Sequence, residues 1–569
     1  MLGSFSFVLH THLPYVLNHG IWPHGMDWLN EAAAECYIPI LNMLYKLRDE
    51  GYKPHLTIGI TPILTEQLSS DVFKEHFVSY LQTKLDAARE DRKLFRTWKN
   101  DHLISLSEMW ENFYSGILND FNNKYGQDII KAFKILQDED IIEIITCAAT
   151  HGYLPLIGND ECIQAQIKTG IITYKKYFGR DPVGIWLPEC AYRPAYKWKR
   201  PVKHKGPLMD RKGIEEILSE NNLYYFIIDT HLLKGGEAIG VYATRFKALK
   251  ELWEIFKKQY KPGPIDVEKT PYEIYLLHPK EGMEPVTVFT RDPRTSIQLW
   301  SAEHGYPGDG WYLEFHKKHY PGGLRYWRVT SAKSSLGDKL EYYPDKVEDR
   351  IKENAGHFKS LIYELLKKHH EKKPDNPGIV VAPYDSELFG HWWFEGPRFL
   401  YYVLKWVQDD PEIELTTCGR FMEQYPANTV IKIPEGSWGE GQGHWIWLNE
   451  WTTWTWEKIY ECEDIMVQTV RKYGNNNDIN IKKILRQMGR ELLLLESSDW
   501  QFLISTWSAR DYAENRVAEH YSRFKRLVNM LETYNSGGTV DQGDWNYLGI
   551  LEKEDGIFEN IKPEFWLNP

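Results

Sequence analysis

The chain has 569 residues, enough for several domains, and its composition is that of a folded protein with an ample core. Hydrophobic residues make up 42% and charged residues 26%, and the formal net charge at pH 7 is −12. A chain this acidic lacks the dense positive charge that binds nucleic acids and anionic membranes, so we expect neither as a partner.

Several features of the sequence indicate the cellular compartment of the protein. No stretch approaches the roughly 18 uninterrupted apolar residues of a membrane-spanning helix, and the amino terminus lacks the basic start of a secretory signal. The six cysteines lie far apart and none belongs to a CxxC pair, which indicates neither a disulfide scaffold nor a cysteine zinc site. These features predict a reduced, cytoplasmic protein.

Aromatic residues are unusually frequent, at 14% of the chain with 23 tryptophans and 35 tyrosines. Flat amphipathic rings stack on the apolar faces of sugars. A Trp-rich core or domain interface would give the same composition, and composition alone favours the core.

Short apolar strands alternate with helical segments over most of the chain. We expect strands at 5–9, 55–60, 141–149, 183–188, 224–229, 378–383 and 413–417, and helices at 31–50, 161–178 and 209–222. This alternation favours an α/β fold with a parallel sheet, either a (β/α) barrel or an open sheet. The absence of GxGxxG after the first strand and of a P-loop motif disfavours a nucleotide-binding fold.

Three regions depart from this alternation. Residues 64–140 are largely helical in pattern, and after about residue 420 long amphipathic helices are expected at 456–473, 482–497 and 511–534. The irregular segment 234–290 is too long for an ordinary connection, so we expect a loop or inserted hairpin there. The predicted domains are a catalytic (β/α) barrel of residues 1–70 and 141–418, a helical insertion of residues 71–140, and a C-terminal helical domain of residues 419–569.

Chemically capable side chains recur directly after the expected strands, at positions that would meet at the carboxyl-terminal rim of a barrel. His10 and His12 alternate with a residue between them, so both point to the same side of an extended segment. They fit a pair of metal ligands, hydrogen-bonding groups for a polar substrate, or two structural histidines. A third histidine, His151, strengthens the case for a site without choosing among these uses.

Two segments carry acids that follow apolar strands. Glu189 lies in GIWLPECAYRP, and Asp385 and Glu387 lie in APYDSELFGHWW. Two carboxylates from different strands are what glycoside cleavage needs, one to attack or stabilise the anomeric carbon and one to protonate the leaving oxygen. Any single one of them could equally be a surface acid. The segment 437–456 holds six tryptophans, which fits either a sugar-stacking loop or a seam between domains.

Five segments occur in a characteristic order: HTHLPY, HGYLP, IWLPECAYRP, APYDSELFGHWW and SSDWQFL. Together they resemble glycoside hydrolase family 57 and, within it, the 1,4-α-glucan branching enzymes, over a span from residue 1 to at least 535. The resemblance implies an incomplete (β/α)7 barrel with a small helical insertion and a C-terminal helical domain that contributes to the active site. It also implies a retaining enzyme without metal or cofactor that acts on an α-glucan polysaccharide such as amylose or glycogen.

The resemblance implies roles for individual residues. Glu189 in LPEC would be the nucleophile, and Asp385 in PYDSE would be the general acid/base. Substrate contacts are implied for His10, His12, His151, Trp28, Arg291, Trp300, Gly308, Trp438, Trp447 and Asp499.

One segment departs from the family pattern. Branching members carry a loop after the nucleophile whose tyrosine is linked to transfer over hydrolysis; here that loop is residues 231–243, with Tyr242 as its only tyrosine. The following segment, about 249–285, is longer than usual. We expect branching, with α-glucan hydrolysis or 4-α-glucanotransfer on the same site as alternatives. A metal-dependent deacetylase using the three histidines and a non-catalytic glucan-binding protein are the competing classes.

Overall fold

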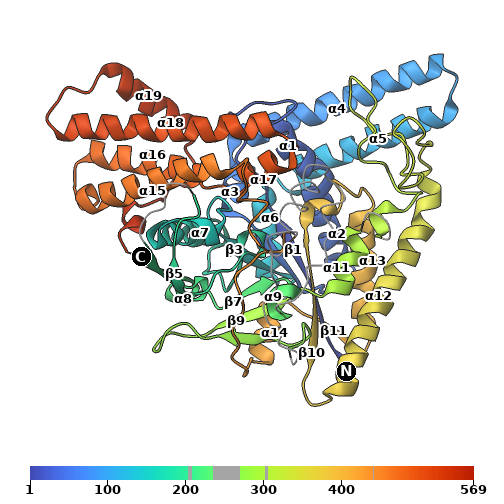
Figure 1. Ribbon diagram of the computed structural model, residues 1–569. Helices are drawn as coiled ribbons and strands as arrows, with labels where there is room; N and C mark the ends of the chain where they lie inside the picture. Colours follow the sequence, from blue (N-terminus) through green and yellow to red (C-terminus); the bar gives the residue numbers. More distant parts are fainter. Residues whose placement is uncertain (203–207, 235–268, 302–304, 440, 442, 569) are drawn as a thin grey trace. The chain divides into compact units, whose positions relative to one another are not determined.

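The computed structural model describes residues 1–202, 208–234, 269–301, 305–439, 441 and 443–568. It divides into two compact units, each formed by segments that are distant in the sequence. Unit one comprises Met1–Ile58, Gln67–Ile144 and Arg291–Tyr425, and unit two comprises Gly59–Glu66, Ile145–Thr290 and Pro426–Pro569. Both units combine helices with strands that are mostly parallel, so the predicted α/β class is confirmed (Figure 1). No helix among the described residues has the length and apolar character needed to cross a membrane.

The sheet of unit one is centred on its first strand. Its strands are β1 (Gly3–Thr11), β10 (Gly378–Asp385) and β11 (Ile413–Leu415), followed in the sheet by the beginnings of β2 (Leu56–Ile60) and β3 (Ile142–Cys147). All residues of β1 are buried, including the polar residues Ser4, Ser6, His10 and Thr11. Parallel pairing with β10 places His10 opposite Asp385 in the register, so two predicted site residues end neighbouring strands.

Helices make up most of the rest of unit one. They are α1 (Met26–Ala32), the π-helical η1 (Ala33–Tyr37), α2 (Ile38–Asp49), α4 (Asp71–Thr97), α5 (Asp101–Asn119), the π-helical η2 (Asp120–Lys124), α6 (Ile129–Asp138), α11 (Pro293–Trp300), η5 (Tyr306–Gly308), η6 (Pro344–Lys346), α12 (Val347–Lys372), η7 (Ser386–Leu388), α13 (Gly396–Gln408) and α14 (Cys418–Gln424). The helix expected over 31–50 is therefore interrupted by a π-helical turn. Side chains of Ser70 and Asn100 accept hydrogen bonds from the first turns of α4 and α5, which fixes where these helices begin.

The sheet of unit two continues from the end of β3. The strand order is β3, β4 (Gly184–Trp186), β7 (Tyr225–Ile228), β9 (Val286–Thr290) and β8 (Tyr275–Leu277), with only β8 antiparallel. Part of the irregular segment 234–290 thus forms the expected hairpin, β8–β9. Its second strand also pairs in parallel with β7, so this strand belongs to the main sheet. Residues 235–268 lie outside the described part of the chain.

One helix prediction in unit two is wrong at its start. Residues Met209–Arg211 form β6, which pairs with β5 (Tyr196–Trp198) in an antiparallel hairpin, and the helix α8 covers only Ile214–Glu220. Gly213 precedes α8, and its N–H donates to the Glu216 carboxylate at 3.1 Å. The pairing with β5, which is a tertiary contact, overrides the local helical pattern of residues 209–211.

The remaining elements of unit two are helical. They are α3 (Pro62–Ser69, shared with unit one), η3 (Leu154–Leu156), α7 (Asp160–Phe178), η4 (Pro188–Cys190), α9 (Thr230–Lys234), α15 (Thr453–Tyr473), α16 (Ile479–Leu495), α17 (Asp499–Thr506), α18 (Arg510–Asn535), α19 (Gln542–Glu554) and η8 (Pro563–Trp566). The three long helices expected after residue 420 are confirmed as α15, α16 and α18, drawn orange to red in Figure 1. The six cysteines are all buried, and none of them forms a disulfide.

Helix α7 approaches the end of β3 very closely at Gly170. A Cβ atom added at Gly170 would lie 2.3 Å from the carbonyl oxygen of Cys147. That distance is far below van der Waals contact, and the obstacle is backbone that cannot rotate away. The glycine is therefore required by packing, although it weakens the helix itself.

We predict that Gly170→Ala destabilises the protein by about 1–3 kcal/mol because the helix must shift away from β3. Gly116→Ala is the matched control: Gly116 is exposed on α5, and a Cβ there meets nothing within 4 Å. That substitution should stabilise by about 0.5–1 kcal/mol through helix propensity alone. Thermal unfolding of both variants measures the difference, and equal shifts of Tm would contradict the packing argument.

Candidate active site

The predicted site residues form two groups, one in each unit. Unit one contains His10, His12, Trp28, Arg291, Trp300, Gly308 and Asp385; unit two contains His151, Glu189, Trp438, Trp447 and Asp499. Tyr242 lies outside the described residues, as does much of the long segment that follows it.

Glu189 has a strained backbone at the carboxyl end of β4. Its φ of 60° and the φ of 47° at Cys190 place two consecutive non-glycine residues in the left-handed region. Each such residue costs on the order of 1–3 kcal/mol and persists only where the surrounding structure holds it. Strain of this kind is concentrated at functional sites, so it supports a chemical role for Glu189.

The segment around Trp438 holds Glu189 in place. Tyr192 and Gly436 exchange two backbone hydrogen bonds of 2.8 and 3.0 Å, and the Trp438 N–H donates to the Glu189 carbonyl at 3.0 Å. The Trp438 indole N–H then donates to Glu189 Oε2 at 2.7 Å, and its ring lies 5.1 Å edge-on from Trp186. A donor on a carboxylate stabilises the charged form, which is the form that can act as a nucleophile.

His151 lies beside the other oxygen of the same carboxylate. Its Nδ1 is 3.9 Å from Glu189 Oε1, which is an ion-pair distance and too long for a hydrogen bond. The same nitrogen is 2.8 Å from Ser498 Oγ, and the Ser498 N–H donates to the His151 carbonyl at 3.2 Å. His151 also has a left-handed backbone, with φ 58°. Ser498 therefore orients His151, a role that the sequence analysis missed although Ser498 lies within the SSDWQFL segment.

Asp499 joins this group at the start of α17. The Ser497 hydroxyl donates to Asp499 Oδ2 at 2.5 Å. Burial raises the pKa of the Cys147 thiol well above its usual value, and the negative charges of Glu189 and Asp499 raise it further. Both acids therefore lie near Cys147, at the end of β3. Unit two thus brings His151, Glu189, Trp438 and Asp499 together.

Trp447 has a supporting position. Its side chain is 1% exposed, and its ring stacks on Tyr153 with centroids 4.3 Å apart. The Tyr153 hydroxyl is 2.8 Å from His444 Nδ1, and His444 Nε2 is 2.6 Å from Glu435. Trp447 thus anchors the tryptophan-rich segment in unit two.

In unit one, His10 and Asp385 lie opposite each other at the carboxyl ends of the neighbouring strands β1 and β10. The ring of His10 is 3% exposed and stacks on that of His12, with centroids 5.9 Å apart. Directly after them, the Thr11 and Ser386 hydroxyls are 2.6 Å apart, which ties the two strand ends together. Unit one therefore brings His10, His12 and Asp385 together.

Glu387 lies in η7, directly after β10, and is buried. Its Oε1 accepts hydrogen bonds from the Tyr37 hydroxyl at 2.7 Å and from the His12 N–H at 3.2 Å. Burial raises the pKa of Glu387 to about 8, with the charge of Asp385 adding to the rise and the Tyr37 hydrogen bond opposing it. Glu387 is therefore mostly protonated at neutral pH, unlike an ordinary surface acid.

The other unit-one candidates surround β10. The ring of Trp300 lies 6.4 Å from Tyr384 and 6.2 Å from Trp392, and Arg291 forms a parallel bridge with Val381. Two further candidates are placed on helices: Trp28 on α1, with its ring 5.1 Å from His24, and Gly308 at the end of η5.

Comparison with known proteins identifies the family. Residues 6–434 match the profile described as glycosyl hydrolase family 57. The chain belongs to this family. Residues 458–566 match a second profile, described as the C-terminal region of 1,4-alpha-glucan branching enzymes. A 1,4-alpha-glucan branching enzyme of Thermococcus kodakarensis is 44% identical over 99% of this chain and 78% of its own length.

Three solved structures have a similar fold. A crystal structure of the T. kodakarensis branching enzyme, in complex with glucose and additives, matches with a TM-score of 0.90 at 43% identity, covering 100% of this chain and 97% of that one. The branching enzyme of Pyrococcus horikoshii gives 0.88 at 40% identity, with 100% and 97% coverage. The alpha-amylase AmyC of Thermotoga maritima gives 0.79 at 28% identity, with 100% coverage of both chains.

We predict that Trp438→Phe lowers turnover roughly ten- to hundredfold. The phenyl ring retains the packing on Trp186 but loses the N–H that fixes and stabilises the Glu189 carboxylate, a hydrogen bond of the charge-assisted class worth about 1.5–3 kcal/mol. Initial rates with amylose, the substrate class expected from the sequence, measure the effect. Trp456→Phe is the matched control, because its buried indole N–H donates to the Trp447 carbonyl at 2.8 Å and touches no carboxylate. Equal losses in the two variants would contradict the role of Trp438.

A second prediction concerns the dependence of stability on pH. Below its usual pKa of 4.5, Glu387 is protonated in the folded and unfolded chains alike. As pH rises from 4.5 to about 8, the folded chain keeps a proton that the unfolded chain has lost. This contribution to stability therefore falls as pH rises, by at most about 1.4 kcal/mol per pH unit, and the loss is complete above the folded-state pKa.

Glu387→Gln removes this proton exchange while retaining an acceptor for Tyr37. The Tm of the variant minus that of the parent should therefore increase steadily between about pH 5 and pH 8, as measured by scanning calorimetry. Glu364→Gln, at an exposed position on α12, is the control for simple loss of a carboxylate. Parallel curves for parent and Glu387→Gln would show that Glu387 ionises normally in the folded protein.

Proposed function

We propose that this family 57 enzyme is a 1,4-α-glucan branching enzyme. It would cut an α-1,4-linked glucan and transfer the released segment to a 6-hydroxyl, forming an α-1,6 branch. The observation that carries this choice is the similarity to branching enzymes along the whole chain, including the C-terminal profile over residues 458–566. The natural substrate would be a storage glucan such as glycogen, made and used in the cytoplasm.

The alternatives are other reactions at the same bond. The similarity to an alpha-amylase, at 28% identity, supports hydrolysis as the first alternative, and 4-α-glucanotransfer is the second. All three reactions share the first chemical step. They differ in whether water, a 4-hydroxyl or a 6-hydroxyl attacks the intermediate, which depends on acceptor binding and on exclusion of water. We propose that Tyr242 and the loop 231–243 influence this choice.

We further propose that Glu189 is the nucleophile and Asp385 the general acid/base. Glu189 attacks the anomeric carbon while Asp385 donates a proton to the departing glucan oxygen, giving a covalent glycosyl-enzyme. The acceptor hydroxyl then attacks the anomeric carbon and displaces the Glu189 carboxylate, while Asp385 accepts the hydroxyl proton. The two inversions together retain the anomeric configuration. The Trp438 hydrogen bond to Glu189 supports this assignment, because it favours an ionised and fixed nucleophile.

The remaining assignments describe how the glucan is bound. We propose that His10, His12 and His151 hydrogen-bond sugar hydroxyls and that no metal or cofactor takes part. Further glucan contacts are proposed for Trp28, Arg291, Trp300, Gly308, Trp438, Trp447 and Asp499. The parallel strands would form an incomplete (β/α)7 barrel, with residues 71–140 as its helical insertion and residues 419–569 as a C-terminal helical domain.

Linkage analysis of an amylose digest tests the reaction type. Incubation with amylose followed by enzymatic debranching should release short chains, and methylation analysis should show new α-1,6 linkages. An increase in reducing ends without new linkages would replace branching by hydrolysis. Activity that survives exhaustive chelation would also exclude a metal-dependent deacetylase.

Glu189→Gln and Asp385→Asn should each lower turnover by more than about a thousandfold, because each removes a group that forms or breaks a bond. Glucan binding by Glu189→Gln, measured by affinity electrophoresis, should persist. The control is again Glu364→Gln, at an exposed position. Near-parental turnover in either active-site variant would remove that residue from the mechanism.

A further inference from the structure

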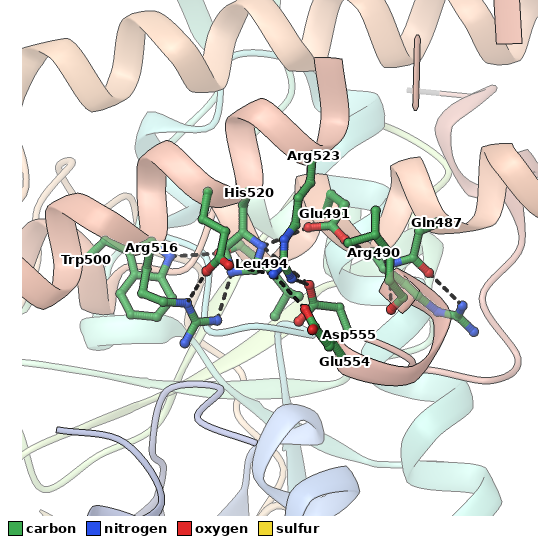
Figure 2. A network of polar contacts seen from close by, with 12 residues as sticks. Gln487, Arg490, Glu491, Leu494, Trp500, Arg516, His520, Arg523, Glu554 and Asp555 are labelled. Atoms are coloured by element: carbon green, nitrogen blue, oxygen red, sulfur yellow. Dashed lines mark hydrogen bonds and ion pairs between the residues drawn. The ribbon is translucent and has the colours of Figure 1, made fainter. Parts of the chain in front are cut away.

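A network of buried charged side chains lies within the helices at the end of unit two (Figure 2). Glu491 on α16, His520 on α18 and Asp555 just after α19 are each 0% exposed, and Arg516 on α18 is 2% exposed. Residues 516, 520 and 523 follow at intervals of four and three along α18, so they share one face of the helix. This face meets α16, so charged groups take a place that apolar side chains would ordinarily fill.

The hydrogen bonds define the proton on His520. Arg516 Nη2 is 2.8 Å from His520 Nε2, and His520 Nδ1 is 2.8 Å from Glu491 Oε2. A guanidinium only donates hydrogen bonds, so Nε2 accepts and Nδ1 carries the proton that is donated to Glu491. His520 is therefore a neutral imidazole with one fixed tautomer, oriented from both sides.

The same three groups, Glu491, His520 and Asp555, are close enough together to suggest a metal site. The cations already present argue otherwise. Arg523 pairs with Asp555, and the His520 nitrogen that faces both acids, Nδ1, already donates its proton to Glu491. Burial and the charge of Asp555 also raise the pKa of Glu491 well above its usual value, and a protonated carboxyl is a poor ligand. The network is thus closed by guanidinium groups.

Trp500 connects this network to helix α17. Its wholly buried indole ring stacks on His520 with centroids 6.5 Å apart, and the Arg516 guanidinium lies 4.9 Å from the ring centroid. The indole N–H donates to the Leu494 carbonyl at 2.8 Å. Trp500 is the second residue of α17, a helix of only eight residues. The clamp formed by Arg516, His520 and Leu494 therefore fixes the start of α17.

The start of α17 also contacts the candidate active site. Ser498 immediately precedes the helix and accepts its first backbone hydrogen bond, from Phe502, at 3.2 Å. The hydroxyl of Ser498 is 2.8 Å from His151 Nδ1, and that nitrogen lies 3.9 Å from Glu189. His151 has a left-handed backbone conformation, with φ 58°, which persists only where the surrounding structure holds it.

We propose that Arg516 and His520 are positioning residues that, through Trp500 and Ser498, hold His151 against the Glu189 carboxylate. Neither residue touches the reacting atoms. Their part is to fix α17 so that the Ser498 hydroxyl stays within hydrogen-bonding distance of His151. A displacement of about 1 Å at a reacting group is enough to change a rate a hundredfold. This inference deepens the proposed function, on which its kinetic test rests.

The test is a double-mutant cycle between Arg516→Met and Ser498→Ala. Arg516→Met should lower kcat with amylose roughly tenfold, with KM changed less than twofold, because substrate groups are not contacted. In the Ser498→Ala background the same substitution should cause less than a twofold further loss, since the link it acts through is already broken. A loss of stability alone would give the same factor in both backgrounds. Equal factors, or a parental kcat in Arg516→Met, would overturn the inference.

Arg516→Lys guards against a variant that does not fold. It keeps the positive charge but loses the planar contact with Trp500, so it should give an intermediate loss of kcat, and parental kcat in a folded Arg516→Lys protein would contradict the inference. Arg526→Met is the matched control. Arg526 lies on the same helix, pairs with Asp544 at 2.8 Å and covers Tyr547, far along the chain from Trp500, so kcat should be parental.

A structural measurement separates this inference from the proposed function. In a crystal structure of Arg516→Met, or of Arg516→Lys if only that variant folds, the distance from His151 Nδ1 to Ser498 Oγ should lengthen from 2.8 Å to beyond hydrogen-bonding range. An unchanged distance would overturn the inference whatever the activity of the parent. A parent without turnover on amylose would overturn the proposed function alone.

Discussion

The hydrogen bond from the Trp438 indole to the Glu189 carboxylate is the interaction on which the unit-two site depends. Glu189 and Cys190 adopt a backbone that no local preference supports, so the conformation must be imposed from elsewhere. It is imposed by a segment 249 residues away in the sequence, which pairs with the backbone at Tyr192 and caps the carboxylate with Trp438. Strand β4 places Glu189 at its carboxyl end, and the tryptophan-rich segment fixes the orientation of the Glu189 carboxylate.

The acids of the two units show how environment separates similar groups. Glu189 is 17% exposed and accepts a hydrogen bond from an indole N–H, an arrangement that favours charge and leaves the carboxylate accessible. Glu387 is 4% exposed and retains its proton at neutral pH because burial penalises its charge. Two acids of similar intrinsic pKa thus differ in protonation because their local environments differ. A neutral Glu387 also spares Asp385 a second negative charge two residues away.

Much of this organisation can be predicted from sequence, because it depends on local patterns. Apolar runs predicted the positions of β1, β4, β7 and β10, and amphipathic periodicity predicted the three long C-terminal helices. The short motifs around Glu189 and Asp385 predicted which acids end strands. Tertiary contacts were beyond reach: the β5–β6 hairpin replaced the expected start of a helix, and the partners of Ser498 and Glu387 depend on residues hundreds of positions away. Burial and protonation of Glu387 follow from that packing, which no linear pattern encodes.

Alkylation of the six buried cysteines can be used to follow local unfolding of the protein. Cys36 and Cys418 lie in unit one, while Cys147, Cys162, Cys190 and Cys462 lie in unit two. The thiolate is the form that reacts with alkylating reagents, and burial reduces both the access of the reagent and the ionisation of the thiol. The native protein should therefore react very slowly with alkylating reagents. Mass spectrometry of the modified peptides would then tell which unit loosens first on heating, with no engineered label.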